Sequence, residues 1–214
     1  MVEFLYIILA YLIGAIPFGY LAGKLNGIDL REHGSKNIGA TNAVRVLGKK
    51  WGIPVFVCDF LKGYLPLLFM SYHLGGDVTR FTAGEMGCYL GVFFALVMGH
   101  TFTCYLHFKG GKGVATTGGC LFAISPIIGG TALLTWVLMM VLTRYVSLSS
   151  MVAGVTMMIA AGFVFCSDGN LRAADVMVLS LLFLIFALVV WKHRSNIVRL
   201  CNGTEPKAFT KKSL

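Results

Sequence analysis

Three polar, glycine-rich segments hold most of the residues in this sequence that could do chemistry. The first runs G-S-K-N-I-G-A-T-N-A-V-R-V-L-G over residues 34–48. If it is helical from about Ile38, residues four apart share one face. The polar residues on or beside that face are Asn37, Thr41, Asn42 and Arg45. The forked guanidinium of Arg45 suits phosphate oxygens, and Ser35 could cap the helix. The alternative interpretation is a solvated loop followed by a capped helix.

The second segment contains G-H-T-F at residues 99–102 and then F-K-G-G-K-G-V-A-T at residues 108–116. Glycines allow backbone N–H groups to approach an anion, and lysines add positive charge. The candidate anion-binding residues are His100, Lys109, Gly110, Gly111, Lys112 and Gly113. An apolar stretch follows directly, so the positive end of a helix dipole would face the same anion. The P-loop spacing G-x-x-x-x-G-K-[ST] is absent, which excludes ATP hydrolysis by that motif. A basic loop against lipid headgroups is the alternative.

The third segment is K-H-R-S-N-I-V-R-L-C-N-G-T-E at residues 192–205, after the last apolar stretch. His193 and Asn196 are three residues apart and could share a helix face, with Arg199 one turn further on. A basic segment after a membrane span is usually an orientation signal and a lipid anchor. By itself, this segment therefore predicts little chemistry.

Two ionisable residues, Asp59 and Lys62, lie inside an apolar stretch and three residues apart. Charge inside a span is costly and is a functional hypothesis by default. These two can neutralise each other, so they are either a structural pair or a link that steadies the polar site. No His, Cys, Asp or Glu residues have metal-ligand spacing, and the six cysteines form no C-x-x-C pair. We therefore expect no metal and no cofactor.

The elements that position these segments are predicted to be membrane-spanning helices of a single domain, residues 1–214. The chain is 57% hydrophobic and 13% charged, whereas soluble domains are about 45–50% apolar and about 25% charged. A span needs about 20 apolar residues. Seven candidates, of which the fourth and seventh are short, give an all-α bundle: Leu5–Leu25, Trp51–Tyr72, Gly84–Leu106, Val114–Ile128, Gly129–Val146, Leu148–Cys166 and Val176–Trp191.

The distribution of basic residues predicts the orientation, because lysine and arginine collect in cytoplasmic loops. With seven spans and the N-terminus outside, Arg80 and Arg172 are the two basic residues on the outer side, together with the acidic residues Glu3, Asp77, Glu85, Asp168 and Asp175. Fifteen basic residues fall on the inner side: Lys24, Arg31, Lys36, Arg45, Lys49, Lys50, Lys109, Lys112, Arg144, Lys192, Arg194, Arg199, Lys207, Lys211 and Lys212. All three polar segments would then face the cytoplasm.

The net charge of +9 could indicate a nucleic-acid partner. The basic residues are instead scattered between apolar stretches, which favours membrane orientation and an anionic substrate. We therefore expect no nucleic acid among the partners.

In order and over almost the whole chain, these segments resemble those of the bacterial acyl-phosphate:glycerol-3-phosphate acyltransferases. The resemblance includes D-F-L-K-G at residues 59–63, and the first two polar segments are its most specific part. The departures are small: Lys36 stands where the family often has Gly, Thr103 where Pro is common, and Ser195 where an acidic residue is common. The H-x-x-x-x-D motif of coenzyme A-dependent acyltransferases is absent.

The resemblance implies that an acyl group passes from acyl phosphate to the 1-hydroxyl of glycerol 3-phosphate, giving lysophosphatidate and inorganic phosphate. It implies a multi-pass protein of the bacterial inner membrane with a cytoplasmic active site. An upstream enzyme that forms acyl phosphate becomes a candidate partner. The residues expected at the catalytic centre are Ser35, Arg45, Lys112, His193 and Asn196. Those expected to bind substrate are Asn37, Thr41, Asn42, His100, Lys109, Gly110, Gly111, Gly113 and Arg199.

Within this site, the glycine loop and Lys112 are expected to hold the donor phosphate. Arg45, Lys109, Ser35 and Asn42 would hold glycerol 3-phosphate. The proton acceptor stays open between His193, His100 and a substrate phosphate. Because acyl phosphate is an activated mixed anhydride, the enzyme must mainly supply position and charge stabilisation, and orientation alone can contribute about 7–11 kcal/mol.

Two other function classes fit the sequence less well. A transporter for a small organic phosphate would place its site near the bilayer midplane, commonly between internal repeats, but the polar residues gather at one interface and no repeat is evident. Transfer of a phosphate-alcohol from a nucleotide-activated lipid would need clustered aspartates for metal, and the five aspartates are not clustered.

Overall fold

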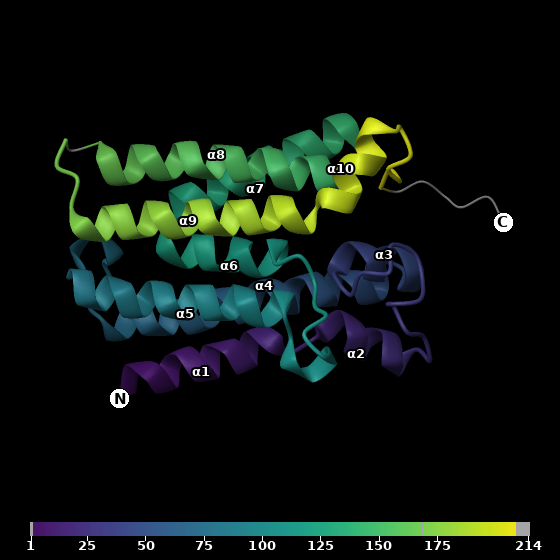
Figure 1. Cartoon of the computed structure of the whole chain (residues 1–214), viewed down its shortest axis with the longest axis horizontal. Helices are drawn as coiled ribbons and strands as arrows, with labels where there is room; N and C mark the ends of the chain where they lie inside the picture. The colour runs from purple at the N-terminus through teal and green to yellow at the C-terminus, as the bar shows by residue number, and fades with distance from the viewer. Residues whose placement is uncertain (1, 168, 209–214) are drawn as a thin grey trace.

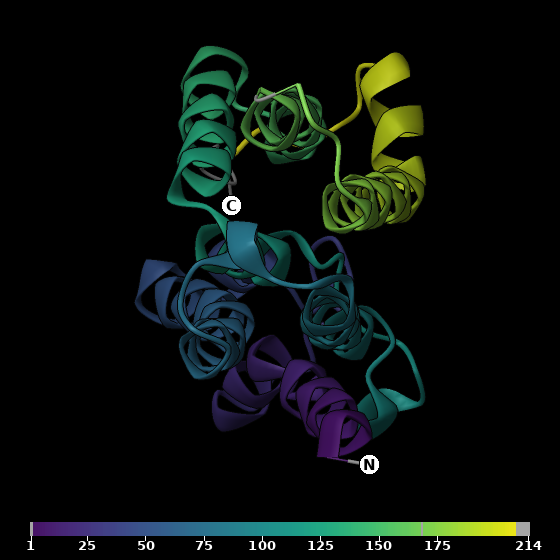
Figure 2. The same cartoon turned by 90° about the vertical axis from the view of Figure 1, so that its left-hand side faces the viewer.

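The computed structural model describes residues 2–167 and 169–208, and all regular secondary structure in these ranges is helical. Asp168, Lys211 and Lys212, which entered the orientation argument, lie outside the described residues. The described part of the chain contains ten α-helices and two short 3₁₀ helices, which form one elongated bundle (Figures 1 and 2). The α-helices are α1 Val2–Ala15, α2 Phe18–Leu25, α3 Ala40–Leu47, α4 Lys49–His73, α5 Ala83–Thr101, α6 Val114–Ile124, α7 Pro126–Thr143, α8 Val146–Cys166, α9 Ala173–Lys192 and α10 Arg194–Cys201.

Six helical segments of the described chain are long and apolar enough to cross a membrane. They are Phe4–Leu25, Lys49–His73, Ala83–Leu106, Pro126–Thr143, Val146–Cys166 and Ala173–Lys192. The fourth expected span, Val114–Ile128, instead forms the shorter α6, because Ser125 ends that helix and Pro126 starts α7. Proline is favoured in the first turn of a helix and cannot continue a preceding one, which moves the expected boundary from Gly129 to Pro126.

The short helix α6 lies inside the bundle. Its 11 residues cover about 16 Å, roughly half of the hydrocarbon core. Six of them are buried, and the helix packs along α4. A Cβ added at Gly63 of α4 would lie 2.2 Å from the Thr116 carbonyl oxygen, and one added at Gly119 would lie 2.1 Å from the Phe60 carbonyl oxygen. These glycines let the two backbones touch, as small residues do between membrane helices.

The first span is broken between α1 and α2 at Ile16 and Pro17. A break inside a membrane frees backbone carbonyls that need other donors. The Thr103 hydroxyl donates to the Ala15 carbonyl at 2.6 Å, and Lys62 Nζ donates to the Ile16 carbonyl at 2.8 Å. The break is thereby tied to the loop after α5 and to the middle of α4.

The polar segments gather at one end of the bundle. Figure 1 shows α3, the loop that precedes α6, and α10 at the end opposite the start of α1. The chain starts at the end opposite the polar segments, runs through α1 and α2 to the polar end, returns through α4, and alternates direction through α5, α6, α7, α8 and α9. The first described residues and α10 therefore lie at opposite ends of the long axis.

Candidate active site

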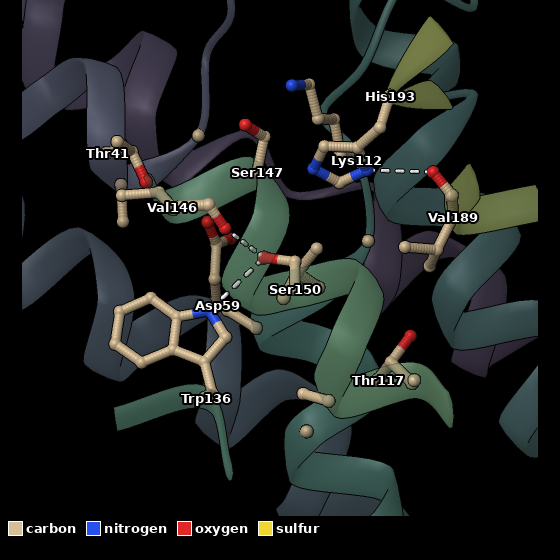
Figure 3. A pocket seen from close by; sticks show the side chains of 18 of the residues that line it. Thr41, Asp59, Lys112, Thr117, Trp136, Val146, Ser147, Ser150, Val189 and His193 are labelled. Carbon is tan, nitrogen blue, oxygen red and sulfur yellow. Dashed lines mark hydrogen bonds between the residues drawn. The ribbon is translucent and has the colours of Figure 1, made fainter. Parts of the chain in front are cut away.

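A cavity of about 430 Å³ lies at the end of the bundle where the polar segments meet. Its polar lining comes from the loop before α3, α3 itself, the loop before α6, the start of α8, and α10 (Figure 3). Its apolar lining comes from the middle of the spans: Phe60, Leu121, Phe122, Leu133, Met157, Ile185 and Phe186. One space thus joins a polar end to an apolar interior.

The first polar segment forms α3, but Ser35 does not cap it. The N-cap residue is Gly39, and no side chain bonds to the first turn, so the capping prediction is wrong. Ser35 lies upstream in a loop and lines the cavity with Asn37, Thr41 and Arg45. The four polar residues of this segment therefore share one cavity, but Gly39, and not Ser35, is the N-cap residue of α3.

Asn42 holds the loop in front of α3. It is 1% exposed; its Oδ1 accepts the Ser35 N–H at 2.8 Å. Its Nδ2 donates to the carbonyls of Leu30 and His33 at 3.1 and 3.0 Å. The amide of Asn42 is thus occupied by protein backbone, and the residue positions Ser35 at the cavity.

The glycine loop differs from a free phosphate nest. The Gly110 N–H donates to the Thr101 carbonyl at 3.2 Å, and the Gly111 N–H donates to the His100 carbonyl at 3.0 Å. Both amides are therefore turned toward α5, and neither glycine lines the cavity. Lys109 is exposed and is also absent from the lining. Direct contact of Lys109, Gly110 and Gly111 with a substrate in this cavity is a prediction that the geometry does not support.

Gly113 and Lys112 do reach the cavity. Gly113 has φ +81°, a left-handed conformation that glycine adopts readily, and it is the N-cap residue of α6. It lines the cavity together with Lys112, Val114 and Ala115. The first turn of a helix carries N–H groups without intrahelical partners and has positive potential. Lys112 and the start of α6 together favour an anion at this point.

Lys112 begins a hydrogen-bond network that joins three distant segments. Its Nζ donates to Asn196 Oδ1 at 2.5 Å, and Asn196 Nδ2 donates to Glu205 Oε1 at 2.6 Å. Glu205 also accepts from Ser147 Oγ and Arg199 Nε, each at 2.7 Å. The network connects α6, α8 and α10 and fixes Lys112 at the polar end of the cavity.

The surroundings shift the pKa values of this network. Burial lowers the pKa of Lys112 to about 8, although Glu205 opposes the shift. For Glu205, burial would raise the pKa, but the hydrogen bonds from Asn196, Ser147 and Arg199 hold it below its usual range. Lys112 is therefore a cation at neutral pH and loses its charge as the pH rises through about 8.

His193 is a buried, neutral imidazole between α9 and α10. It is 2% exposed, and its Nδ1 lies 2.8 Å from the Val189 carbonyl oxygen (Figure 3). Burial, reinforced by the nearby charge of Lys112, lowers the pKa of His193 to about 4. A carbonyl partner requires Nδ1 to carry the proton, which leaves Nε2 as an acceptor.

A second buried group, made of Asp59, Lys62 and His100, lies against the same cavity. Lys62 Nζ is 2.7 Å from Asp59 Oδ1, which confirms the mutual neutralisation of the pair, and His100 Nδ1 is 3.5 Å from the same oxygen. Asp59 and His100 line the cavity. His100 Nε2 lies against Gly111, where an added Cβ would approach it to 2.1 Å.

Several cavity residues were missed by the sequence analysis: Glu205, Ser147, Ser150, Trp136 and Thr117. Glu205 had one usable signal, because it is the only acidic residue in the basic segment after the last span. Ser147, Ser150 and Trp136 lie in apolar helices, where nothing in the pattern separates them from ordinary packing residues. Trp136 Nε1 donates to Ser150 Oγ at 3.1 Å, and both residues contribute to one wall of the cavity (Figure 3).

Fold and site together define a multi-pass integral membrane protein with a cavity that joins a polar, cationic end to an apolar interior. A family model described as glycerol-3-phosphate acyltransferase matches residues 4–203. The chain belongs to this glycerol-3-phosphate acyltransferase family.

Named relatives and solved structures agree with this assignment. The glycerol-3-phosphate acyltransferase of Acholeplasma laidlawii is 42% identical over 96% of this chain and 93% of its own length. That of Bacillus subtilis (strain 168) is 43% identical over 95% and 96%. The crystal structure of PlsY (YgiH), an integral membrane glycerol 3-phosphate acyltransferase, in its glycerol 3-phosphate form is 39% identical, with a TM-score of 0.84 over 97% of this chain and 96% of that one. Its lysophosphatidic acid form gives a TM-score of 0.81.

Proposed function

We propose that this enzyme transfers an acyl group from acyl phosphate to the 1-hydroxyl of glycerol 3-phosphate. The hydroxyl oxygen attacks the acyl carbonyl carbon, the carbon–oxygen bond to phosphate breaks, and lysophosphatidate and inorganic phosphate are formed. The observation that carries the proposal is that Lys112 lines a cavity whose polar end continues into an apolar interior. Relatives named glycerol-3-phosphate acyltransferase, and PlsY in its glycerol 3-phosphate and lysophosphatidic acid forms, support the acceptor and the product.

The donor phosphate binds Lys112 and the first turn of α6. Gly113 and the first residues of α6, Val114 and Ala115, line the cavity, and a cationic side chain beside a helix N-terminus stabilises the charge that grows on the leaving phosphate. Asn196 accepts a hydrogen bond from Lys112 and holds its ammonium in place. Because phosphate is a good leaving group, this stabilisation and the orientation of the hydroxyl are the main contributions required of the protein.

Glycerol 3-phosphate binds on the opposite wall, beside α3. Arg45 and Ser35 offer a forked cation and a hydroxyl there, with Asn37 and Thr41 of the same segment. Asn42 acts on this wall through Ser35, whose N–H it binds. Lys109, being exposed, contributes only to the positive potential around the cavity entrance.

The acyl chain lies among the apolar residues of α6–α9. The cavity also reaches the lipid-facing surface, since two of its lining residues, Phe56 of α4 and Leu133 of α7, are 44% and 45% exposed. A chain can therefore enter from the bilayer without crossing the polar end.

A substrate phosphate is the proton acceptor in this proposal. The pKa of His193, about 4, makes its imidazole a weak base. Neutral His193 instead accepts a hydrogen bond from the glycerol hydroxyl through Nε2 and orients the oxygen for attack. His100 cannot easily take this part, because its Nε2 lies against Gly111.

The proposal includes the topology. The chain crosses the membrane seven times, with the N-terminus outside, and the buried α6 carries the fourth crossing. A helix shorter than the hydrocarbon core is tolerated where its ends are enclosed by protein, as they are here by α4, α5 and α7. The cavity then opens to the cytoplasm at the bacterial inner membrane, where an enzyme that forms acyl phosphate is a candidate partner.

Purified protein tests the reaction. Palmitoyl phosphate and glycerol 3-phosphate should give equal amounts of inorganic phosphate and lysophosphatidate, with the acyl group on the first carbon by mass spectrometry. Phosphate release should require glycerol 3-phosphate, and palmitoyl coenzyme A should not replace the donor. Uptake of glycerol 3-phosphate into liposomes without turnover, or transfer from coenzyme A alone, would overturn the proposal.

A further inference from the structure

The buried ion pair in α4 lies next to the loop that presents Lys112. Asp59 and Lys62 are 2% and 6% exposed. Lys62 also satisfies the Ile16 carbonyl at the break of the first span. That second contact is enough to explain why a hydrogen-bond donor stands at position 62, since it satisfies a carbonyl at the end of α1. It does not account for Asp59, whose Oδ1 also faces His100 Nδ1 at 3.5 Å.

His100 connects Asp59 to the glycine loop through both its ring and its backbone. The ring has Nδ1 toward Asp59 and Nε2 against Gly111. The backbone carbonyl of His100 accepts the Gly111 N–H, and the next carbonyl, that of Thr101, accepts the Gly110 N–H. The loop is therefore fastened to the end of α5 at three points, and the residue after the fastened glycines is Lys112.

We propose that Asp59 and His100 are positioning residues that set the place of Lys112 in the cavity, and that Lys62 serves to keep the Asp59 carboxylate ionised and fixed. The proposal rests on the function proposed above, because Lys112 is there assigned to the donor phosphate. Asp59 orients the imidazole, the imidazole supports Gly111, and the supported loop places the ammonium of Lys112 at the start of α6. A displacement of about 1 Å at a reacting group can cost about a hundredfold in rate.

The alternative is that Asp59 and Lys62 form a purely structural ion pair. Two variants distinguish this alternative from the proposed positioning role of Asp59. Asp59→Asn alone leaves Lys62 charged and buried, which destabilises the protein under either interpretation. The double variant Asp59→Asn/Lys62→Gln removes both charges and keeps an amide donor at position 62 for the Ile16 carbonyl, so it leaves neither an unpaired buried charge nor a carbonyl without a donor. If the pair is only structural, the double variant regains both stability and turnover. If Asp59 acts through His100, the double variant regains stability but not turnover.

A double-mutant cycle locates the coupling. Gly111→Ala adds a methyl group where His100 Nε2 now lies, and His100→Ala removes the ring. If the ring supports the loop, the two substitutions are not additive, as expected for residues in contact. We expect each single variant to lower kcat by about tenfold or more, and the double variant to lower it no further than His100→Ala alone.

The experiment measures kcat, the KM for glycerol 3-phosphate and the thermal unfolding midpoint of the purified full-length variants, with palmitoyl phosphate as donor. The expected result is an Asp59→Asn/Lys62→Gln variant that unfolds within a few degrees of wild type, with kcat lowered at least about tenfold and KM for glycerol 3-phosphate nearly unchanged. Near-normal kcat in that variant, or additive losses for Gly111→Ala and His100→Ala, would overturn the inference. A wild-type protein with no phosphate release would instead refute the proposed function.

Discussion

The two ends of the bundle use charged and polar residues in different ways. At the end that holds the start of α1, the pairs are mostly local: Asp77 with Arg80, Thr82 with Glu85, and Arg172 with Asp175, each three residues apart. One longer contact, from Arg172 to the Thr79 carbonyl, joins two loops there. These contacts cap helices and close turns, which is the ordinary use of polar groups at helix ends.

At the other end, the contacts join segments that are far apart in sequence. Lys112 and Asn196 are 84 residues apart, Ser147 and Glu205 are 58 apart, and Lys62 and Ile16 are 46 apart. Several of these side chains are buried, and they surround a cavity. Local pairs stabilise the element that carries them, whereas long-range buried pairs fix one side chain relative to another. Only the second kind of arrangement can hold two substrates in register.

The largest expected effect concerns the charge of Lys112, at the cavity end of the bundle. Lys112→Ala should lower kcat/KM by about a thousandfold, the upper part of the range for the loss of one group that stabilises a transition state. Lys109→Ala is the matched control, since it removes the same charge three residues away but outside the cavity, and it should cost less than about threefold. Phosphate release from palmitoyl phosphate measures both. Equal losses would show that the positive field, and not the position of one ammonium, matters.

The pH dependence follows from the same residue. Lys112 is charged below its pKa of about 8, so kcat/KM should fall as the pH rises through that value, by about tenfold per unit. Lys112→Arg keeps its charge to a much higher pH, and the alkaline fall should disappear or move upward even if the variant is slower. An unchanged alkaline limb in Lys112→Arg would assign the titration to another group.

His193 should matter less than Lys112. His193→Ala removes an acceptor that orients the hydroxyl but not the base, so we expect a loss of about ten- to a hundredfold in kcat. His193→Gln, which offers an amide oxygen in a similar place, should recover part of it. A loss as large as that of Lys112→Ala, without recovery by glutamine, would favour a histidine base over a substrate phosphate.

Substitution of Glu205 tests whether the hydrogen-bond network around Lys112 supports turnover or only stability. Glu205→Gln removes a charge that accepts three hydrogen bonds, and hydrogen bonds to charged groups contribute about 1.5–3 kcal/mol each. We expect a lower thermal midpoint together with a lower kcat, because Asn196 and therefore Lys112 lose their support. Glu85→Gln, at the other end, should leave kcat unchanged. A fall in kcat for Glu85→Gln would remove the distinction between the two ends.

The smallest effect is expected at the cap of α5. Thr82 and Glu85 form a capping box there, and the loss of such a cap costs about 1 kcal/mol. Thr82→Ala should therefore lower the unfolding midpoint by a few degrees or less while turnover stays at the wild-type level. Thermal unfolding and the phosphate assay, run on one preparation, check both statements.

The sequence predicts most of the spans because length and hydropathy are local properties. The regions around Leu5–Leu25, Trp51–Tyr72 and Leu148–Cys166 all appear as spans close to the expected bounds. The fourth expected span was too long, since Pro126 begins a new helix. No local feature of the sequence shows that the 11-residue apolar helix α6 is buried, because its environment is formed by α4 and α7.

The sequence predicts which segments form the candidate site, but not which of their polar groups face the cavity. Arg45, Lys112, His193 and Asn196 do meet at one cavity. The geometry does not support the expected substrate contacts of Gly110 and Gly111, because the carbonyls of Thr101 and His100 occupy their amides, whereas Gly113 does line the cavity. Asn42 and Glu205 likewise bind groups that no spacing rule connects to them. Long-range hydrogen bonds decide which polar residue faces a ligand and which one holds its neighbour.

The most direct test is a structure of this protein with glycerol 3-phosphate and a non-hydrolysable acyl phosphonate bound. The account predicts a phosphonate oxygen at hydrogen-bond distance, about 3 Å, from Lys112 Nζ, the glycerol phosphate beside Arg45, and the alkyl chain against Leu121, Met157 and Phe186. A phosphonate held away from Lys112, or an alkyl chain lying outside the α6–α9 lining, would contradict the claim that this cavity is where acyl transfer occurs.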